Sequence, residues 1–176
     1  MLPDPLHPAV VHFPIVLTFL LPLFAIGAMV AIRKGARPLR AWSIPVVGAA
    51  ALALSSWVAV QTGEAQDERV ERVVAEQPLE SHEESAELFL TMTGVMLVIT
   101  GIGLARGVVG RAARLTATVG AVALIAAAAR VGHSGGQLVY RYGAASAYAS
   151  PSGSMTRNAD GATIPAVADR TDDHDR

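Results

Sequence analysis

Four long apolar blocks constrain the fold of this chain more than any other feature of its sequence. The first covers 10–32 with only His12 and Thr18 as polar side chains, and at about 1.5 Å per helical residue it exceeds the ~30 Å hydrocarbon core of a bilayer. Two uncharged blocks follow at 41–60 and 88–105, and a shorter fourth at 115–131 suffices if flanking side chains snorkel. The pattern predicts an all-α polytopic membrane protein, a bundle of four transmembrane helices.

The composition excludes several other classes of protein. With 52% hydrophobic and 16% charged residues among 176, the chain is too short to bury four apolar helices in a soluble fold. A net charge of -1 provides no basic surface, so no nucleic-acid partner is expected. The absence of cysteine excludes disulfides, thiolate metal sites and covalently attached haem. Residues 1–9 lack Lys and Arg, so we expect the first block to be a span and not a cleaved signal peptide.

The charges are sorted between the connecting segments. Segment 33–40 carries four basic residues and segment 106–114 three, with no acid in either, whereas 61–87 carries nine acids and two arginines. The positive-inside rule places the two basic segments in the cytoplasm. We therefore expect a multi-pass protein of the bacterial inner membrane, with both termini and the acidic loop on the periplasmic or extracellular side.

The acidic loop and the C-terminal region have their own predicted structure. Residues 63–77 have the pattern of an amphipathic helix that ends at Pro78 and lies on the outer membrane surface or caps the bundle. The sequence Ser81-His82-Glu83-Glu84 matches a capping box, which predicts that Ser81 caps the third span. Residues 144–176 lack apolar periodicity and are expected to be a disordered polar tail that follows the transmembrane domain, 1–143.

Four of the five histidines fall at the outer ends of the predicted spans, and none falls at the cytoplasmic ends; the four are His7, His12, His82 and His133. The fifth, His174, lies in the predicted tail. Imidazoles bind transition metals, and two imidazoles from facing helices hold a b-type haem without covalent attachment. Glu64 lies just beyond the second span, where it could ligate a metal or orient an imidazole.

The histidines differ in how strongly they indicate a binding site. A single histidine at a helix end, such as His82 in a capping turn, is more often structural. His12 lies inside an apolar run, where an unpartnered ring is costly, and His133 is flanked by glycines that permit close approach of a ligand. We therefore expect His12 and His133 to be the first ligands, followed by His82 and His7.

Several motifs resemble one family of membrane proteins. They are the stretch 6–15 with the sequence LHPAVVHFPI, Thr62-Gly63-Glu64-Ala65, His82-Glu83, and the stretch 132–140 with the sequence GHSGGQLVY, followed by Gly143. Together they resemble, over about residues 6–143, the DUF2231 family of predicted bacterial membrane proteins, although Ser134 stands where a more apolar residue is expected. The family has no established activity. The resemblance implies a hint of electron transport, because some members occur with cytochrome-like or Rieske-type domains, and it assigns the motif histidines to His7, His12, His82 and His133.

Two functions are consistent with these features. The first is a non-enzymatic protein whose outer histidines bind b-type haem or a transition-metal ion for electron transfer or redox assembly, with a periplasmic redox protein or a larger membrane complex as partner. The second is a structural or accessory membrane subunit, without a cofactor, whose histidines form a hydrogen-bonded cap. A transporter is disfavoured because no charge lies at the middle of a span.

Overall fold

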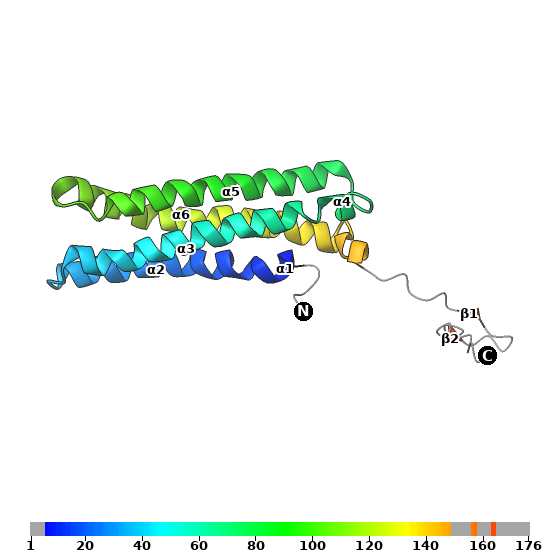
Figure 1. Ribbon diagram of the computed structural model, residues 1–176, viewed down its shortest axis with the longest axis horizontal. Coiled ribbons are helices and arrows are strands. Elements are labelled where there is room, and N and C mark those ends of the chain that lie inside the picture. The colour runs from blue at the N-terminus through cyan, green and yellow to red at the C-terminus, as the bar shows by residue number, and fades with distance from the viewer. Residues whose placement is uncertain (1–5, 149–155, 158–162, 165–176) are drawn as a thin grey trace, which may run out of the picture.

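Four long helices pack side by side in the computed structural model of the protein, which describes residues 6–148, 156–157 and 163–164 (Figure 1). They are α2 (His12–Arg33), α3 (Pro38–Glu64), α5 (Glu76–Ile102) and α6 (Gly107–Tyr140). Each is long and apolar enough to cross a membrane, with α1 (His7–Val10) extending the first. The predicted all-α bundle of four transmembrane helices is confirmed, and its helices extend beyond the predicted spans.

A proline interrupts the first helix near its outer end. Val11 separates α1 from α2. Pro14 has no N–H to donate to the carbonyl of Val10, so the regular hydrogen-bond ladder is broken at this point. The break leaves α1 as a short separate element that contacts α3.

The outer connection between α3 and α5 contains the short helix α4 (Asp67–Val70), in which Val70 is buried. The outer loop therefore does contain a helix, but the predicted extent of 63–77 is wrong, since α3 continues to Glu64 and α5 begins at Glu76. Pro78 lies in the first turn of α5, where a missing N–H costs nothing, so it starts this helix instead of ending another.

The predicted capping role of Ser81 is also wrong. The N-cap of α5 is Ala75, and Ser81 lies within the helix, where its carbonyl accepts a hydrogen bond from the Ser85 hydroxyl. His82 is consequently carried on a full helical turn and not on a fraying helix end, which fixes the direction of its side chain.

The centre of the bundle is apolar and closely packed. Its most completely buried large side chains include Leu21 on α2, Trp42 and Leu52 on α3, and Leu124 on α6. The outward faces also carry large apolar side chains, among them Phe19 and Val119. A surface that is apolar all round suits lipid, since the same faces in water would form a large exposed patch.

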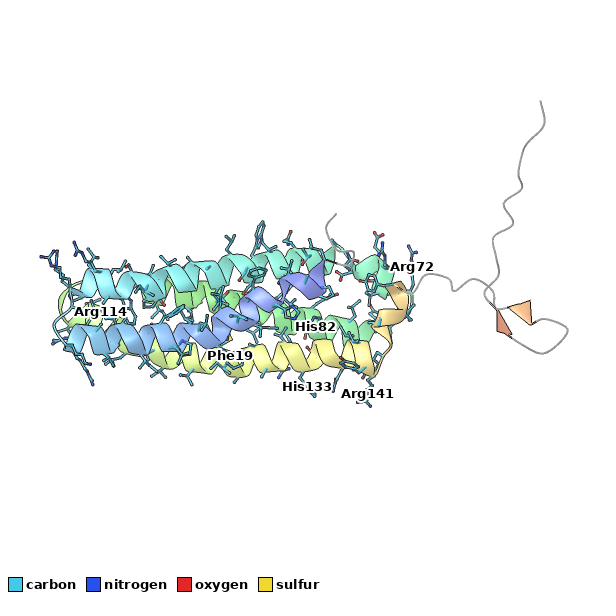
Figure 2. All side chains as sticks on the ribbon, turned by 90° about the horizontal axis from the view of Figure 1, so that it is seen from below. Phe19, Arg72, His82, Arg114, His133 and Arg141 are labelled. Atoms are coloured by element: carbon cyan, nitrogen blue, oxygen red, sulfur yellow. The ribbon has the colours of Figure 1, made fainter. Side chains whose placement is uncertain are left out.

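The end of the bundle opposite α4, which the charge pattern predicts to be cytoplasmic, is held by two buried polar side chains. Trp42 donates its indole N–H to the carbonyl of Thr100 at 2.9 Å, and Arg114 donates to the carbonyls of Gly103 (2.7 Å) and Ala105 (3.1 Å). The carbonyls of Gly103 and Ala105 lie beyond the end of α5, whereas that of Thr100 also accepts a hydrogen bond from the Gly103 N–H at 3.1 Å. Figure 2 shows Arg114 at the opposite end of the bundle from His82.

At the other end, η1 (Ala144–Tyr148), a 3-10 helix, packs against the loop. Ala144 is buried with Val70, Val74, Leu79 and Leu138 in a small apolar cluster separate from the main core. The five residues of η1 fall within 144–176, the range predicted as a tail. Further along, β1 (Thr156–Arg157) pairs antiparallel with β2 (Thr163–Ile164), with Thr156 opposite Ile164. The rest of the predicted tail, including His174, lies outside the described residues.

Candidate functional site at the outer end of the bundle

A cavity of about 510 Å³ lies at the end of the bundle that carries α4 and η1. Its walls come from α1, α3, α4, α5, α6 and η1, so every part of the outer end contributes to it. His7 and His82 both line this cavity. The structure thus brings together two of the four predicted ligands, from helices that are far apart in the sequence.

His7 is held by the returning helix of its own hairpin. Its Nδ1 lies 2.8 Å from the carbonyl oxygen of Ala59 and 3.4 Å from the hydroxyl of Thr62, both on α3. Because a carbonyl only accepts, the neutral ring carries its proton on Nδ1 and keeps a lone pair on Nε2. A backbone hydrogen bond at Nδ1 is the usual way in which proteins orient a metal-binding imidazole.

His82 is held in the same way by α6. Its Nδ1 lies 2.9 Å from the Ser134 hydroxyl, whose own proton is donated to the carbonyl of Val131 at 3.0 Å. Since that proton is already used, the Ser134 oxygen accepts from His82, and Nδ1 is again the protonated nitrogen. In the neutral form of each cavity histidine, Nδ1 is therefore hydrogen-bonded and Nε2 keeps its lone pair.

Two glycines allow these rings to lie against the neighbouring helices. A Cβ at Gly63 would come within 3.3 Å of the His7 ring, and a Cβ at Gly135 within 3.0 Å of the His82 ring. Both separations are shorter than ordinary van der Waals contact, so a side chain at either position would push its histidine away. The glycines at these positions are explained by the close approach of the imidazoles.

Carboxylates surround the histidines in the cavity wall. They are Glu64 on α3, Asp67 on α4, and Glu83 and Glu87 on α5. Burial raises the pKa of the Asp67 carboxyl, the negative charges of Glu64 and Glu71 raise it further, and His7 opposes the shift. The cavity wall therefore combines two imidazoles with four carboxyl groups.

The other two predicted ligands lie elsewhere. His12 is exposed in the first turn of α2, and His133 is exposed on α6, where its Nε2 accepts a hydrogen bond from the Gln137 amide at 3.0 Å. Figure 2 shows His133 on the outside of the bundle and His82 between the helices. Neither His12 nor His133 lines the cavity. Ligand binding by these two residues stays a prediction that their positions do not favour.

The donor set of the cavity limits what it could hold. Among residues 6–148, 156–157 and 163–164, no three His, Asp or Glu side chains are grouped closely enough to hold a metal ion. Glu64, the predicted additional ligand, lines the cavity, and its Oε2 accepts a hydrogen bond from the Gln61 amide at 2.8 Å. The buried side-chain oxygen of Gln66, also in the cavity wall, has no hydrogen-bond partner within the part of the chain that the structure describes.

Several residues of the site are not identifiable from the histidine pattern alone. Asp67 and Gln66 reach the cavity from the short helix α4 and its N-cap, and the sequence shows them only as members of an acidic loop. Ser134 and Gly135 are part of the motif that ends the family resemblance, but their contact with His82 depends on how α5 packs on α6. The sequence signal for Ser134 and Gly135 is a hydroxyl residue followed by glycine, which occurs in α6 as Ser134-Gly135 and in α3 as Thr62-Gly63.

The comparison with known families confirms the resemblance. The chain belongs to the DUF2231 family, whose description is "predicted membrane protein" and whose profile matches residues 3–147. The match covers the whole bundle and reaches η1. Neither the search of curated proteins nor that of solved structures finds a match.

The raised pKa of Asp67 predicts a pH-dependent stability. A folded state that raises this pKa disfavours the ionised carboxylate, so stability falls as pH rises from 3.8 through the folded-state pKa. Asp67→Asn removes that charge and should raise the melting midpoint at pH 7 by about 1–2 °C, a small effect because the side chain is partly solvated. The difference should close as the pH is lowered towards 3.8.

Thermal unfolding of the detergent-solubilised protein at a series of pH values measures this effect. Glu68→Gln, in the exposed neighbouring position, is the matched control and should leave the midpoint unchanged. A lower midpoint for Asp67→Asn at pH 7 would mean that the ionised carboxylate stabilises the fold, for example through His7, and would overturn the assignment.

Proposed function

We propose that the outer cavity binds one metal-centred group between His7 and His82 and that the protein serves electron transfer or redox assembly at the outer face of the membrane. The observation that carries this proposal is the pair of imidazoles in one cavity, each with Nδ1 occupied and Nε2 free. Hydrogen-bonded orientation at one nitrogen with a lone pair at the other is what a metal ligand requires.

A b-type haem suits the donor set better than a bare ion. A transition-metal ion held by protein alone needs three or four ligands, and the described residues offer no such group. Haem iron already has four porphyrin nitrogens and needs only two axial imidazoles. The cavity volume of about 510 Å³ also lies within the roughly 300–1,000 Å³ of typical cofactor sites. The group would supply a one-electron change at iron, and this chain would bind it, orient it and shield it from lipid.

The acidic loop supports a cationic redox partner. Nine acids and two arginines occur between residues 61 and 87, on the side of the cavity that is farthest from the basic segments. A surface of one sign steers an oppositely charged protein and sets its orientation at encounter. We therefore favour a basic periplasmic redox protein as the partner over an acidic one.

The alternative function is a structural or accessory subunit without a cofactor. The same hydrogen bonds favour it, because His7 ties α1 to α3 and His82 ties α5 to α6 at the outer helix ends. In that case the imidazoles are a hydrogen-bonded cap and the cavity is a site for lipid or for another subunit. The two functions differ in whether the purified protein contains a metal.

The absorption spectrum of the detergent-purified protein separates the two functions. If haem is bound, a Soret band should be present, and dithionite should sharpen the α and β bands. Replacing either His7 or His82 by alanine should reduce haem occupancy about tenfold or more, since each supplies one axial ligand. The controls His12→Ala and His133→Ala should retain the wild-type spectrum.

Each other outcome has a defined meaning. If the control variants lose haem and the cavity variants keep it, His12 and His133 are the ligands instead of His7 and His82. A flat spectrum with bound metal in elemental analysis would replace haem by an ion at the same histidines. A flat spectrum without metal would leave the structural cap as the function.

We further propose that the cavity faces the periplasm or extracellular space. The proposal is supported by the seven basic residues of the segments at the other end of the bundle. Because the chain has no cysteine, single-cysteine variants report the orientation without background. Glu71, in the outer loop, and Ala36, between α2 and α3, are both exposed.

A membrane-impermeant maleimide applied to intact cells tests this orientation. Glu71→Cys should be labelled in intact cells, whereas Ala36→Cys should be labelled only after the membrane is permeabilised. The reverse pattern would place the cavity in the cytoplasm and would exclude a periplasmic partner.

A further inference from the structure

The two halves of the bundle hold their histidines by equivalent contacts. Thr62 follows Ala59 by three residues and precedes Gly63, just as Ser134 follows Val131 and precedes Gly135. In each half the hydroxyl donates to the carbonyl three residues earlier and lies beside the histidine Nδ1, and the glycine lies against the ring. One hairpin, α1–α3, thus repeats the local structure of the other, α5–α6.

The equivalence extends along the core of the first helix of each hairpin. Adding 75 to the number of His7 gives His82, and the same shift carries five of the six buried positions of α2 onto buried positions of the second hairpin; the sixth, Pro22, matches the half-buried Leu97. These pairs are Pro14/Phe89, Thr18/Thr93, Leu21/Met96, Ala25/Thr100 and Ala28/Gly103. The alternating spacing of three and four residues is common to the inward faces of bundle helices, so the significant point is that the shift which aligns the cores is the one that aligns His7 with His82.

The second helices match as well, with a shift of 72. Four buried positions of α3 coincide with buried positions of α6, namely Trp42/Arg114, Pro45/Ala117, Ala49/Ala121 and Leu52/Leu124. The same shift relates Gly48 to Gly120; Gly48 lies against Phe24 and Leu21, and Gly120 lies against Met96, the match of Leu21. The three-residue difference between the shifts falls between Ala28 and Trp42, at the turn between the two helices.

The helix packing has the matching symmetry. Within the hairpins α2 packs on α3 and α5 packs on α6, and between them α3 packs on α5 and α2 packs on α6. Exchanging α2 with α5 and α3 with α6 leaves this set of contacts unchanged. Such an exchange describes a twofold axis along the bundle, as in membrane proteins built from parallel repeats.

The two ends of the bundle have kept this symmetry to different degrees. At the inner end Trp42 is matched by Arg114, and the two side chains bond different carbonyls. At the outer end the histidine, the hydroxyl and the glycine are all retained. The two hairpins have equivalent contacts in the cavity wall and different contacts at the opposite end. This difference favours a ligand that contacts both hairpins.

We propose that this chain is a tandem duplication of a histidine-bearing helical hairpin, and that its outer cavity is a twofold site that takes a single ligand on the axis between His7 and His82. The ligand part of this inference rests on the proposed function, whereas the duplication does not. The chemical class is a metal centre that accepts two equivalent imidazoles on opposite sides, as haem iron does. Thr62 with Gly63, and Ser134 with Gly135, are the positioning residues of the two halves.

Matched glycine substitutions test the equivalence in the full-length protein. Gly63→Ala and Gly135→Ala should each weaken hemin binding, followed at the Soret band, about tenfold, and the two effects should agree within about threefold, because each methyl displaces one axial imidazole. The control Gly136→Ala, at a helical position with no neighbour within 4 Å, should leave hemin binding unchanged. The exchange Thr62→Ser with Ser134→Thr should also leave it unchanged.

The outcomes separate failure of the ligand from failure of the duplication. A strong effect at one glycine and none at the other would show that the halves are not equivalent and would overturn the proposal. If the wild-type protein binds neither hemin nor Zn²⁺, the proposed function fails. The melting midpoints then decide the duplication: Gly136→Ala should raise the midpoint through helix propensity, and Gly63→Ala and Gly135→Ala should fall below it by similar amounts. Unequal shifts would contradict the duplication.

Discussion

The lack of water inside a bilayer is the constraint on which this structure depends. Every backbone group within the hydrocarbon must be satisfied by the protein, so four helices form and irregular backbone is confined to their ends. Among the buried hydroxyls, Thr18 donates to the carbonyl of Pro14 and Thr100 to that of Met96, whereas the Ser56 hydroxyl has no partner within the residues that the structure describes. Chemistry that requires exposed polar groups is therefore restricted to the two ends of the bundle.

The ends are used differently. At one end Trp42 donates to the carbonyl of Thr100, and Arg114 donates to those of Gly103 and Ala105, so both side chains tie neighbouring helices to the end of α5. At the other end the hydrogen bonds of His7 and His82 use Nδ1 of each ring. These bonds fix the orientation of the ring and therefore the position of Nε2. The contacts of Trp42 and Arg114 stabilise helix ends, whereas those of His7 and His82 also leave a ring nitrogen available.

Two hairpins with the same internal contacts explain why both histidines reach one cavity. In each, the first helix carries a histidine near its outer end, and the returning helix holds the ring with a hydroxyl and a glycine. Because the two hairpins pack on each other, both rings line one cavity. The acidic loop and η1 then close the cavity over them, with Asp67 and Tyr148 in its wall.

Much of the fold could be predicted from the sequence because transmembrane helices are encoded by composition over long blocks. The helix ends were harder: Pro78 looks like a stop signal but stands in a first turn, and Ser81 matches a capping box inside a helix. The placement of the candidate site at the end of the bundle with the acidic loop also follows from the sequence, through the positions of the histidines. The choice among histidines does not, because it depends on which face of each helix turns inward. His12 appeared costly in an apolar run, yet it is exposed on the outer surface of α2, and His7 turns inward because α1 is set off from α2 by the break at Val11.

Cross-linking of introduced cysteines tests most directly whether His7 and His82 share one cavity. The double variants His7→Cys/His82→Cys and His12→Cys/His133→Cys are each treated with a short bifunctional thiol reagent, and the chain is then cut at a protease site inserted after Arg72. The shared cavity predicts that the halves of the first variant stay joined on a denaturing gel and that those of the second separate. Separation of the first variant with joining of the second would contradict it.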